Sequence, residues 1–138
     1  MKIFIKDGVI EKLNLNPHHF KSHGRIYSVD IIDYDMEEVT VSTPSRLEFN
    51  FKEVKFLRFT YAKDSLGKEI YEDDIIECNG KGYIVYWDEE ILVWRVKSIE
   101  PPDRTYYCYN LSSLIKKESL KIVGNINEFQ SISSLFQK

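Results

Sequence analysis

Lys63-Asp-Ser-Leu-Gly-Lys-Glu-Ile-Tyr-Glu-Asp-Asp-Ile-Ile-Glu77 is the stretch that decides the fold of this chain. A polar turn with Gly67 leads into a short strand at Ile70, and an acidic elbow leads into a second strand at Ile75. Glycine takes positive φ without a steric penalty, and aspartate bonds to nearby backbone in turns. The segment therefore predicts two strands joined at tight corners, and it contains no catalytic constellation.

Strand signals continue on both sides of this stretch, because apolar and polar residues alternate over short runs. On its N-terminal side, strands are predicted over residues 25–34, 38–42, 46–51 and 54–59. The Asn79-Gly80 dipeptide on its C-terminal side predicts a tight hairpin. Further strands are predicted there over residues 82–87, 91–96, 106–109 and 120–124.

Two segments have helical spacing instead. Apolar residues predict a short helix over residues 111–117 with Asn110 as its N-cap. A second apolar stripe predicts a terminal amphipathic helix over residues 128–136. The chain therefore reads as mainly β with minor α. We expect an N-terminal β segment over residues 1–50 and a compact half over residues 51–138, and no internal repeat stands out.

Length and composition suit one folded protein of ordinary size. The chain has 138 residues, of which 43% are hydrophobic and 14% aromatic, and aromatic and β-branched residues favour strands. The first residues, 1–7, form too short an apolar run for a signal peptide, and no stretch is long enough to span a membrane. We therefore expect a cytoplasmic protein, without a membrane partner, in which Cys78 and Cys108 stay reduced. A single disulfide between them is the alternative, because two cysteines permit one pairing.

Charge is distributed unevenly along the chain. Residues 64–90 hold nine acids and two bases, whereas residues 91–138 hold seven bases and four acids. The densest basic cluster is Lys116, Lys117 and Lys121, which is thin for a phosphate backbone. An acidic centre with a basic end suits self-association or intramolecular pairing at least as well as nucleic acid.

Two separated blocks of the sequence follow the pattern of a known family. The matching residues of the first block are Thr60, Lys63, Asp64, Gly67, Lys68, Glu69, Ile70, Tyr71, Glu72, Asp74 and Ile75. The second block is Val123–Ile126 followed by Glu128. In this order, over about residues 59–128, the blocks resemble the YopX family of bacteriophage and prophage proteins.

The resemblance has departures as well as matches. Tyr61 and Ala62 replace the usual glycine and leucine, Asp73 replaces the elbow glycine, and Asn127 stands where an aromatic residue or His is common. The first 50 residues lack the opening expected of the family. The resemblance implies a C-terminal half folded as an SH3-like β-barrel, a phage or prophage origin, and the cytoplasm of a bacterial host. It implies no established activity.

Metal binding and catalysis find little support in the residues. His19 and His23 have the spacing of two ligands on one helical turn, with His18 beside them. No carboxylate or cysteine lies close in sequence, so a polar loop is the better interpretation and no metal site is predicted. Cys78 and Cys108 lie in apolar strand-like context, where cysteine acts as a small hydrophobe. We predict no catalytic residue, no cofactor and no enzyme activity.

The acidic elbow has two interpretations. Glu72, Asp73 and Asp74 are a candidate cation site or acid pair, but Asp74 also suits a turn in which it accepts backbone N–H bonds before Ile75. Turn chemistry is favoured. Tyr71 with the surplus charge of Glu72 and Asp73 is then left as an acidic contact surface.

Two tryptophans complete the candidate binding residues. Trp87 and Trp94 with nearby tyrosines suit either stacking of nucleic-acid bases or anchoring of a protein interface. A turn over residues 88–90 need not place the two tryptophans on one side of the sheet. We expect a non-enzymatic phage accessory protein that contacts itself or another phage or host protein. Nucleic-acid binding, with Lys116 and Lys117 on the phosphates, is the alternative.

Overall fold

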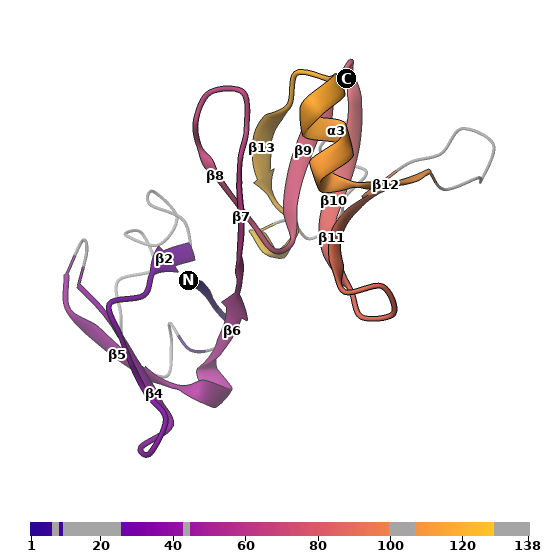
Figure 1. Ribbon diagram of the computed structural model, residues 1–138. Coiled ribbons are helices and arrows are strands. Elements are labelled where there is room, and N and C mark those ends of the chain that lie inside the picture. The colour runs from indigo at the N-terminus through magenta and orange to yellow at the C-terminus, as the bar shows by residue number, and fades with distance from the viewer. Residues whose placement is uncertain (7–8, 10–25, 43–44, 100–106, 129–138) are drawn as a thin grey trace. The chain divides into compact units, whose positions relative to one another are not determined.

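The computed structural model describes residues 1–6, 9, 26–42, 45–99 and 107–128. The chain divides into two compact units, Met1–Arg58 and Phe59–Lys138 (Figure 1). The boundary lies later than residue 50, where the sequence placed it, because β6 (Val54–Leu57) pairs with β1 (Lys2–Ile5) and so stays in the first unit.

The described residues of the first unit form two antiparallel sheets. One has the order β2-β1-β6, where β2 spans Ile26–Ser28. The other has the order β3-β4-β5, with strands at Ile31–Asp33, Glu38–Val41 and Leu47–Asn50. Between β5 and β6 lies a short 3-10 helix, η1 (Phe51–Glu53).

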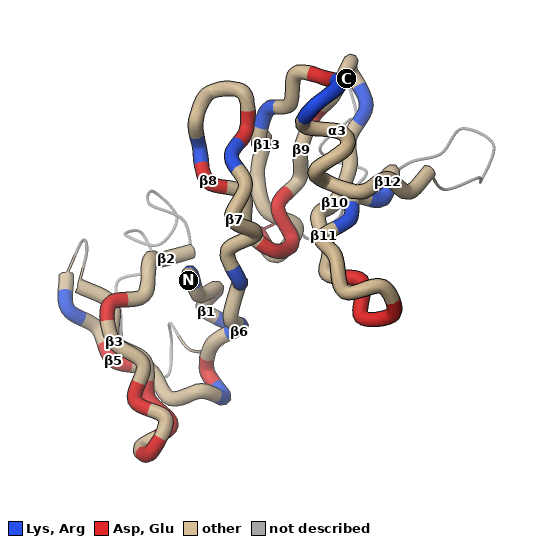
Figure 2. Tube along the Cα trace, viewed as in Figure 1, with Lys and Arg blue, Asp and Glu red and all other residues tan. Residues whose placement is uncertain are grey.

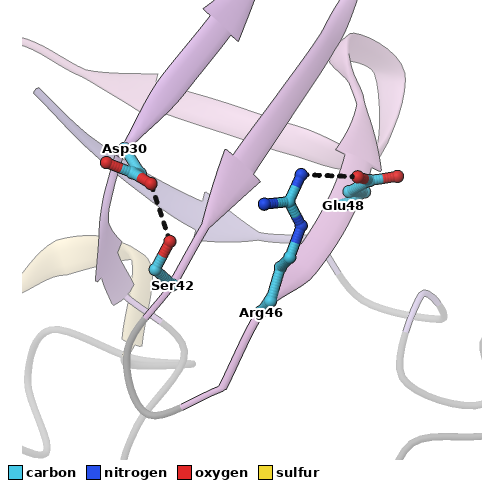
Figure 3. Close-up of polar contacts among 4 residues, drawn as sticks. All are labelled: Asp30, Ser42, Arg46 and Glu48. Atoms are coloured by element: carbon cyan, nitrogen blue, oxygen red, sulfur yellow. Dashed lines mark hydrogen bonds and ion pairs between the residues drawn. The ribbon is translucent and has the colours of Figure 1, made fainter.

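The two sheets of the first unit share one bent strand. At the bend, the Val29 N–H donates to the Met1 carbonyl at 3.0 Å, and the Asp30 N–H donates to the Thr40 carbonyl at 2.9 Å. The Ser42 hydroxyl also donates to the Asp30 carboxylate at 2.7 Å (Figure 3). Thus β2 and β3 are two halves of one strand, and the strand order of the unit is β6-β1-β2/β3-β4-β5.

Alternation along these strands gives the first unit its core. Its buried side chains are Ile3, Ile5, Val9, Tyr27, Val39, Val41, Phe49 and Val54. The helix η1 begins at a capping box: the Asn50 side chain accepts from the Lys52 N–H at 3.0 Å, and Glu53 accepts from the Asn50 N–H at 2.9 Å. This cap satisfies backbone donors that a helix start otherwise leaves open.

The second unit has one larger antiparallel sheet and one hairpin. The sheet has the order β12-β11-β10-β9-β13, with strands at Cys108–Asn110, Val93–Ser98, Lys81–Asp88, Asp74–Cys78 and Lys121–Asn125. The hairpin pairs β7 (Phe59–Lys63) with β8 (Glu69–Tyr71). Asn79 and Gly80 turn between β9 and β10 with φ of 53° and 77°, as the sequence predicts.

A short helix, α3 (Leu111–Lys117), lies in sequence between β12 and β13 (Figure 1). It begins after Asn110 as predicted, although the Asn110 side chain makes no cap bond. Leu111 and Leu114 of α3 join the core of the second unit. The other buried members are Ile70, Ile76, Cys78, Tyr83, Val85, Val96 and Leu120. A second 3-10 helix, η2 (Ile126–Glu128), follows β13.

Both units use the same strand order. In each, the fifth strand lies beside the first, then the second, third and fourth follow: β6-β1-β2/β3-β4-β5 and β13-β9-β10-β11-β12. Each has a short helix before its fifth strand, η1 or α3. The sequence showed no repeat, so the likeness is one of topology. Among the described residues no ladder joins β12 to β13, so the sheet is open and mainly-β is the confirmed part of the fold prediction.

One predicted strand begins in the wrong place. The strand expected from Ile91 starts at Val93, because residues 89–92 form a turn closed by the Leu92 N–H donating to the Asp88 carbonyl at 2.8 Å. The terminal helix predicted over residues 128–136 lies outside the described residues beyond Glu128. Within the described part of the chain, no helix is both long and apolar enough to cross a membrane.

Candidate functional site

The two family blocks meet in the second unit, first at the turn after β7. The Asp64 carboxylate accepts three backbone N–H bonds, from Leu66 and Lys68 at 2.9 Å each and from Ile122 of β13 at 3.1 Å. Burial raises the pKa of Asp64, but these bonds and the Lys68 charge outweigh it and hold the pKa below its usual value. Gly67 has a φ of 83°, as predicted for this turn.

The blocks meet again at the acidic elbow. The Asp74 carboxylate accepts the Tyr71 N–H at 2.7 Å and the Asn125 side-chain amide at 3.0 Å. Asp73 has a φ of 67° and accepts the Asn127 side-chain amide at 3.0 Å. We call Asp64, Asp73, Asp74, Asn125 and Asn127 the clasp, because they join the first family block to the second.

The clasp changes the interpretation of the predicted acidic surface. Tyr71 is only 7% exposed, and burial, with the Glu69 charge, raises its pKa. Asp73 is bonded to Asn127, and the backbone carbonyl of half-buried Glu72 accepts from Asn125 at 3.1 Å. The structure therefore places these three residues in the joint between β8 and β9, and leaves little of Tyr71 for a partner.

The two tryptophans face the same side of the sheet. Trp87 of β10 pairs directly with Trp94 of β11, and their ring centroids lie 5.2 Å apart in an edge-to-face arrangement. The turn over residues 89–92 sets this register. A turn over residues 88–90 shifts the pairing by an odd number of residues and sends one ring to the opposite face.

The tryptophan pair lines a groove of about 450 Å³, which we call the aromatic groove. Its walls come from β7, the turn between β10 and β11, and α3. The lining residues are Thr60, Tyr61, Ala62, Trp87, Leu92, Val93, Trp94, Leu111, Ser112, Ile115 and Lys116. Three predicted residues, Trp87, Trp94 and Lys116, thus converge on one site.

Tyr61 and Leu92, two exposed residues with positive φ, form the rim of the groove. Tyr61 is 88% exposed at a φ of 63°, and Leu92 is 66% exposed at a φ of 56°. Positive φ in a residue other than glycine costs about 1–2 kcal/mol. Tyr61 is held there by an irregularity in β7, where the Thr60 hydroxyl donates to the Ile70 carbonyl at 2.7 Å. Such irregularities aim a side chain away from a regular ladder.

The positions that depart from the family pattern are informative here. Tyr61 and Asp73 stand where that pattern has glycine, and both have positive φ, of 63° and 67°. Asp73 uses its side chain in the clasp. Tyr61 instead extends an aromatic ring into solvent, stacked against Phe59 at 4.8 Å between centroids. Sequence reasoning missed Tyr61 and Leu92, and the replaced glycine was the signal for Tyr61.

The charges around the groove are mixed. Of the lining residues that the structure describes, Lys116 is the one with a charge. Asp88 at the end of β10 pairs with Arg95 of β11 at 3.3 Å. The turn between these strands carries the exposed residues Glu89 and Glu90, and Figure 2 shows acidic residues in red there. Lys117 lines a different pocket of about 250 Å³ beside Cys78 and Glu118. The two predicted lysines therefore do not form one basic patch.

No catalytic arrangement emerges from the described residues. Cys78 is buried, and burial, with the Glu118 charge, raises the pKa of its thiol, which disfavours a reactive thiolate. Cys108 is exposed, and both thiols are free. In the described part of the chain no group of three His, Cys, Asp or Glu residues is placed to hold a metal. The histidines at 18, 19 and 23 lie outside it.

Fold and site define a mainly-β protein of two small antiparallel units, one of which carries an aromatic groove. The chain belongs to the YopX protein family, whose model matches residues 22–130. The match extends on the N-terminal side beyond the expected start near residue 59 and takes in most of the first unit. Comparison with curated proteins found no match, and comparison with solved structures found none.

Proposed function

We propose that this protein is a phage or prophage accessory protein that works without catalysis, by binding a segment of another protein in the aromatic groove. One observation carries the proposal. Tyr61 is 88% exposed at a positive φ beside the Trp87–Trp94 pair. A strained, solvent-exposed aromatic residue weakens the isolated fold, and a bound partner offsets that cost.

The groove suits a protein segment better than a nucleic acid. Bases stack on aromatic rings, but single-strand binders also line the path of the backbone with positive charge. Among the described lining residues Lys116 is the one cation. Glu89 and Glu90 lie in the same turn as the rim residue Leu92 and add negative charge there. Tryptophan, tyrosine and leucine in one concave surface are typical of an interface that buries apolar side chains.

The proposal also includes the partner, its compartment and the fold of the second unit. Its partner is a second copy of the chain or another phage or host protein in the bacterial cytoplasm. The second unit is an SH3-like barrel: its strand order, with the fifth strand beside the first and a short helix before the fifth, supports this fold. In such a barrel, the groove lies between the turn after the second strand and the helix.

Site-specific photo-crosslinking in cells that carry the prophage tests the groove. Ser112 and Ser113 are adjacent exposed residues of α3, but Ser112 lines the aromatic groove and Ser113 lines the other pocket. A photo-reactive residue at position 112 is expected to trap a protein, and one at position 113 is not. Equal crosslinking at both positions, or crosslinking at 112 that survives Tyr61→Ser, contradicts the proposal.

The self-association version has a test of its own. Light scattering gives the solution mass of the full chain at high concentration. A dimer that dissociates with Tyr61→Ser identifies a second copy as the occupant of the groove. A chain that stays monomeric removes this version and leaves a different protein as the partner.

The nucleic-acid alternative predicts different behaviour for the two lysines. Contact with phosphates is long-range and sensitive to salt, so Lys116→Glu and Lys117→Glu both weaken binding of single-stranded DNA or RNA. A protein partner in the groove is affected by Lys116→Glu alone, because Lys117 lines another pocket. Absence of nucleic-acid binding at low salt ends the alternative.

A further inference from the structure

The first unit presents an exposed apolar surface on the turn between β3 and β4. Tyr34 is 73% exposed and Met36 is 65% exposed. The Tyr34 ring packs edge-on against Phe51 of η1 at 6.0 Å between centroids, and Phe51 packs edge-on against Phe56 at 5.2 Å. Because Phe56 packs on the core, this row of rings connects the surface to the interior.

The turn that carries this surface is built to hold its shape. The Asp33 carboxylate accepts the N–H groups of Asp35 and Met36 at 3.1 and 3.0 Å. The Phe51 N–H donates to the Glu37 carbonyl at 2.9 Å, which ties η1 to the turn. A turn whose backbone is fixed in this way loses less conformational entropy when a partner binds.

The same two elements build the aromatic groove in the second unit. There, Leu92 comes from the turn between the second and third strands, and Ser112 and Ile115 come from the helix before the fifth strand. In the first unit, Tyr34 comes from the turn after the bent second strand, and Phe51 comes from the helix before the fifth strand. The shared strand order therefore puts an exposed apolar surface at the matching place of both units.

Charge sets the two surfaces apart. Residues 33–38 contain four acids and no base (Figure 2). The helix η1 contributes exposed Lys52 and buried Glu53. In the aromatic groove of the second unit, Lys116 is the one charged residue among the described lining residues. An exposed tyrosine ring attracts a cation, most often arginine, and carboxylates nearby add to this attraction.

We propose that Tyr34 and Met36, with the carboxylates of Asp33, Asp35 and Glu37 around them, form a second docking surface, and that its partner is an arginine- or lysine-containing protein segment with apolar residues. The apolar side chains of the bound segment pack on Met36, and its arginine or lysine group lies over the Tyr34 ring. Complementary charge steers the segment to the surface and makes its binding sensitive to salt.

Fluorescence anisotropy on the full chain tests this surface. The probe is a short fluorescein-labelled peptide that alternates Arg and Leu, and the matched control peptide alternates Glu and Leu. We expect the first peptide to bind and the second not to. The double variant Tyr34→Ser, Met36→Ser is expected to weaken binding about tenfold. Both side chains are exposed, so the variant is expected to unfold at the same denaturant concentration as the wild type.

Two further variants keep this test separate from the proposed function. Leu66→Ser removes a leucine that is 67% exposed in the turn after β7, and it is expected to change nothing. Tyr61→Ser disables the aromatic groove of the second unit and is expected to leave the first-unit surface intact. Binding that is lost with Tyr61→Ser and unaffected by the double variant overturns the inference, because the peptide then uses the groove.

Two other results also overturn the inference. Equal binding of both peptides means that apolar contact alone drives association. A dimer, seen by light scattering, that dissociates only in the double variant means that a second copy of this chain covers the surface. Binding of the Arg–Leu peptide that falls with salt and with the double variant supports the inference.

Discussion

The clasp and the aromatic groove lie in the same unit, yet their residues serve different ends. The clasp residues are buried or half-buried, and their polar atoms bond to each other or to backbone. The groove is lined mainly by residues outside the family pattern, and its rim residues Tyr61 and Leu92 are exposed on positive-φ backbone. The motif that names the family therefore marks the frame of the fold, and the groove beside it is the better candidate for function.

This difference follows from what each kind of residue must satisfy. A buried carboxylate needs hydrogen-bond partners, so Asp64 and Asp74 require particular donors in β13 and at its end. Such demands link distant parts of the sequence and produce a recognisable pattern. A groove needs only apolar side chains of suitable size, which many residues provide. Loss of stability should therefore dominate when the clasp is altered, and loss of binding when the groove is altered.

The largest effect is expected for Asp74→Ala. The substitution leaves the buried Tyr71 N–H and the Asn125 amide without the carboxylate that accepts them at 2.7 and 3.0 Å. Two charge-assisted bonds are lost, so the free energy of unfolding should fall by about 3 kcal/mol. Urea unfolding followed by tryptophan fluorescence measures the change. Asp74→Asn keeps one oxygen acceptor and should recover part of the loss.

A small change in the free energy of unfolding for Asp74→Ala contradicts this prediction. A loss below about 1 kcal/mol places the elbow on the surface in solution and removes the contrast between clasp and groove. Gly67→Ala offers a comparison in the same region, because Gly67 has a φ of 83° and a Cβ there meets no atom within 4 Å. Its cost of about 1 kcal/mol reports backbone strain alone.

Asp64 should make the stability of the second unit depend on pH. Its pKa is lower in the folded chain than its ordinary value, so it stabilises the fold above the unfolded pKa of about 3.9 and loses this effect as pH falls through the folded pKa. At neutral pH, Asp64→Asn should lower the free energy of unfolding by about 2 kcal/mol. Below about pH 4 the wild type and the variant should converge.

Urea unfolding at a series of pH values measures the convergence. Two curves that stay parallel into the acid range show that the Asp64 charge contributes nothing and that its hydrogen bonds act through geometry alone. Convergence identifies the Asp64 turn as the acid-labile end of the clasp.

The turns around the clasp could be predicted from the sequence, because each turn depends on the residues that form it. The turn at Gly67, positive φ at Asp73 and the hairpin at Asn79-Gly80 follow from side chains that favour those conformations. The bonds from Asp74 and Asp73 to Asn125 and Asn127 could not be predicted, because they join residues more than 50 positions apart. For this reason the sequence suggested Asp73 as part of a contact surface, whereas its carboxylate accepts a bond from Asn127.

The groove was harder to predict because it depends on register. The Trp87–Trp94 pairing is set by the length of the turn between the two strands, and the expected turn over residues 88–90 is one residue shorter than the observed turn over residues 89–92. In the first unit, Phe51 is the last residue of the strand predicted over residues 46–51, but it lies in η1 after the strand ends at Asn50. The shared topology of the two units left no trace in the sequence, since each unit reaches it with different residues.

The groove prediction that best separates stability from binding is Tyr61→Gly. Glycine adopts the φ of 63° without strain, so the free energy of unfolding should stay the same or rise by up to about 1 kcal/mol. Crosslinking from position 112 should be lost, because the ring of Tyr61 forms the rim of the groove. A variant that is both less stable and fully able to crosslink shows that Tyr61 is structural and belongs with the clasp.

The smallest effect is expected for Arg46→Ala in the first unit. Arg46 pairs with Glu48 at 3.3 Å, but the two side chains are 66% and 57% exposed (Figure 3). Water screens such pairs, so the free energy of unfolding should change by less than about 0.5 kcal/mol, and added salt should remove even that. The pair resembles the clasp in being polar and close, and it differs in exposure. A loss as large as that of Asp74→Ala means that burial does not explain the strength of the clasp, whereas a negligible loss leaves burial as the property that separates the polar joints of this protein from its surface pairs.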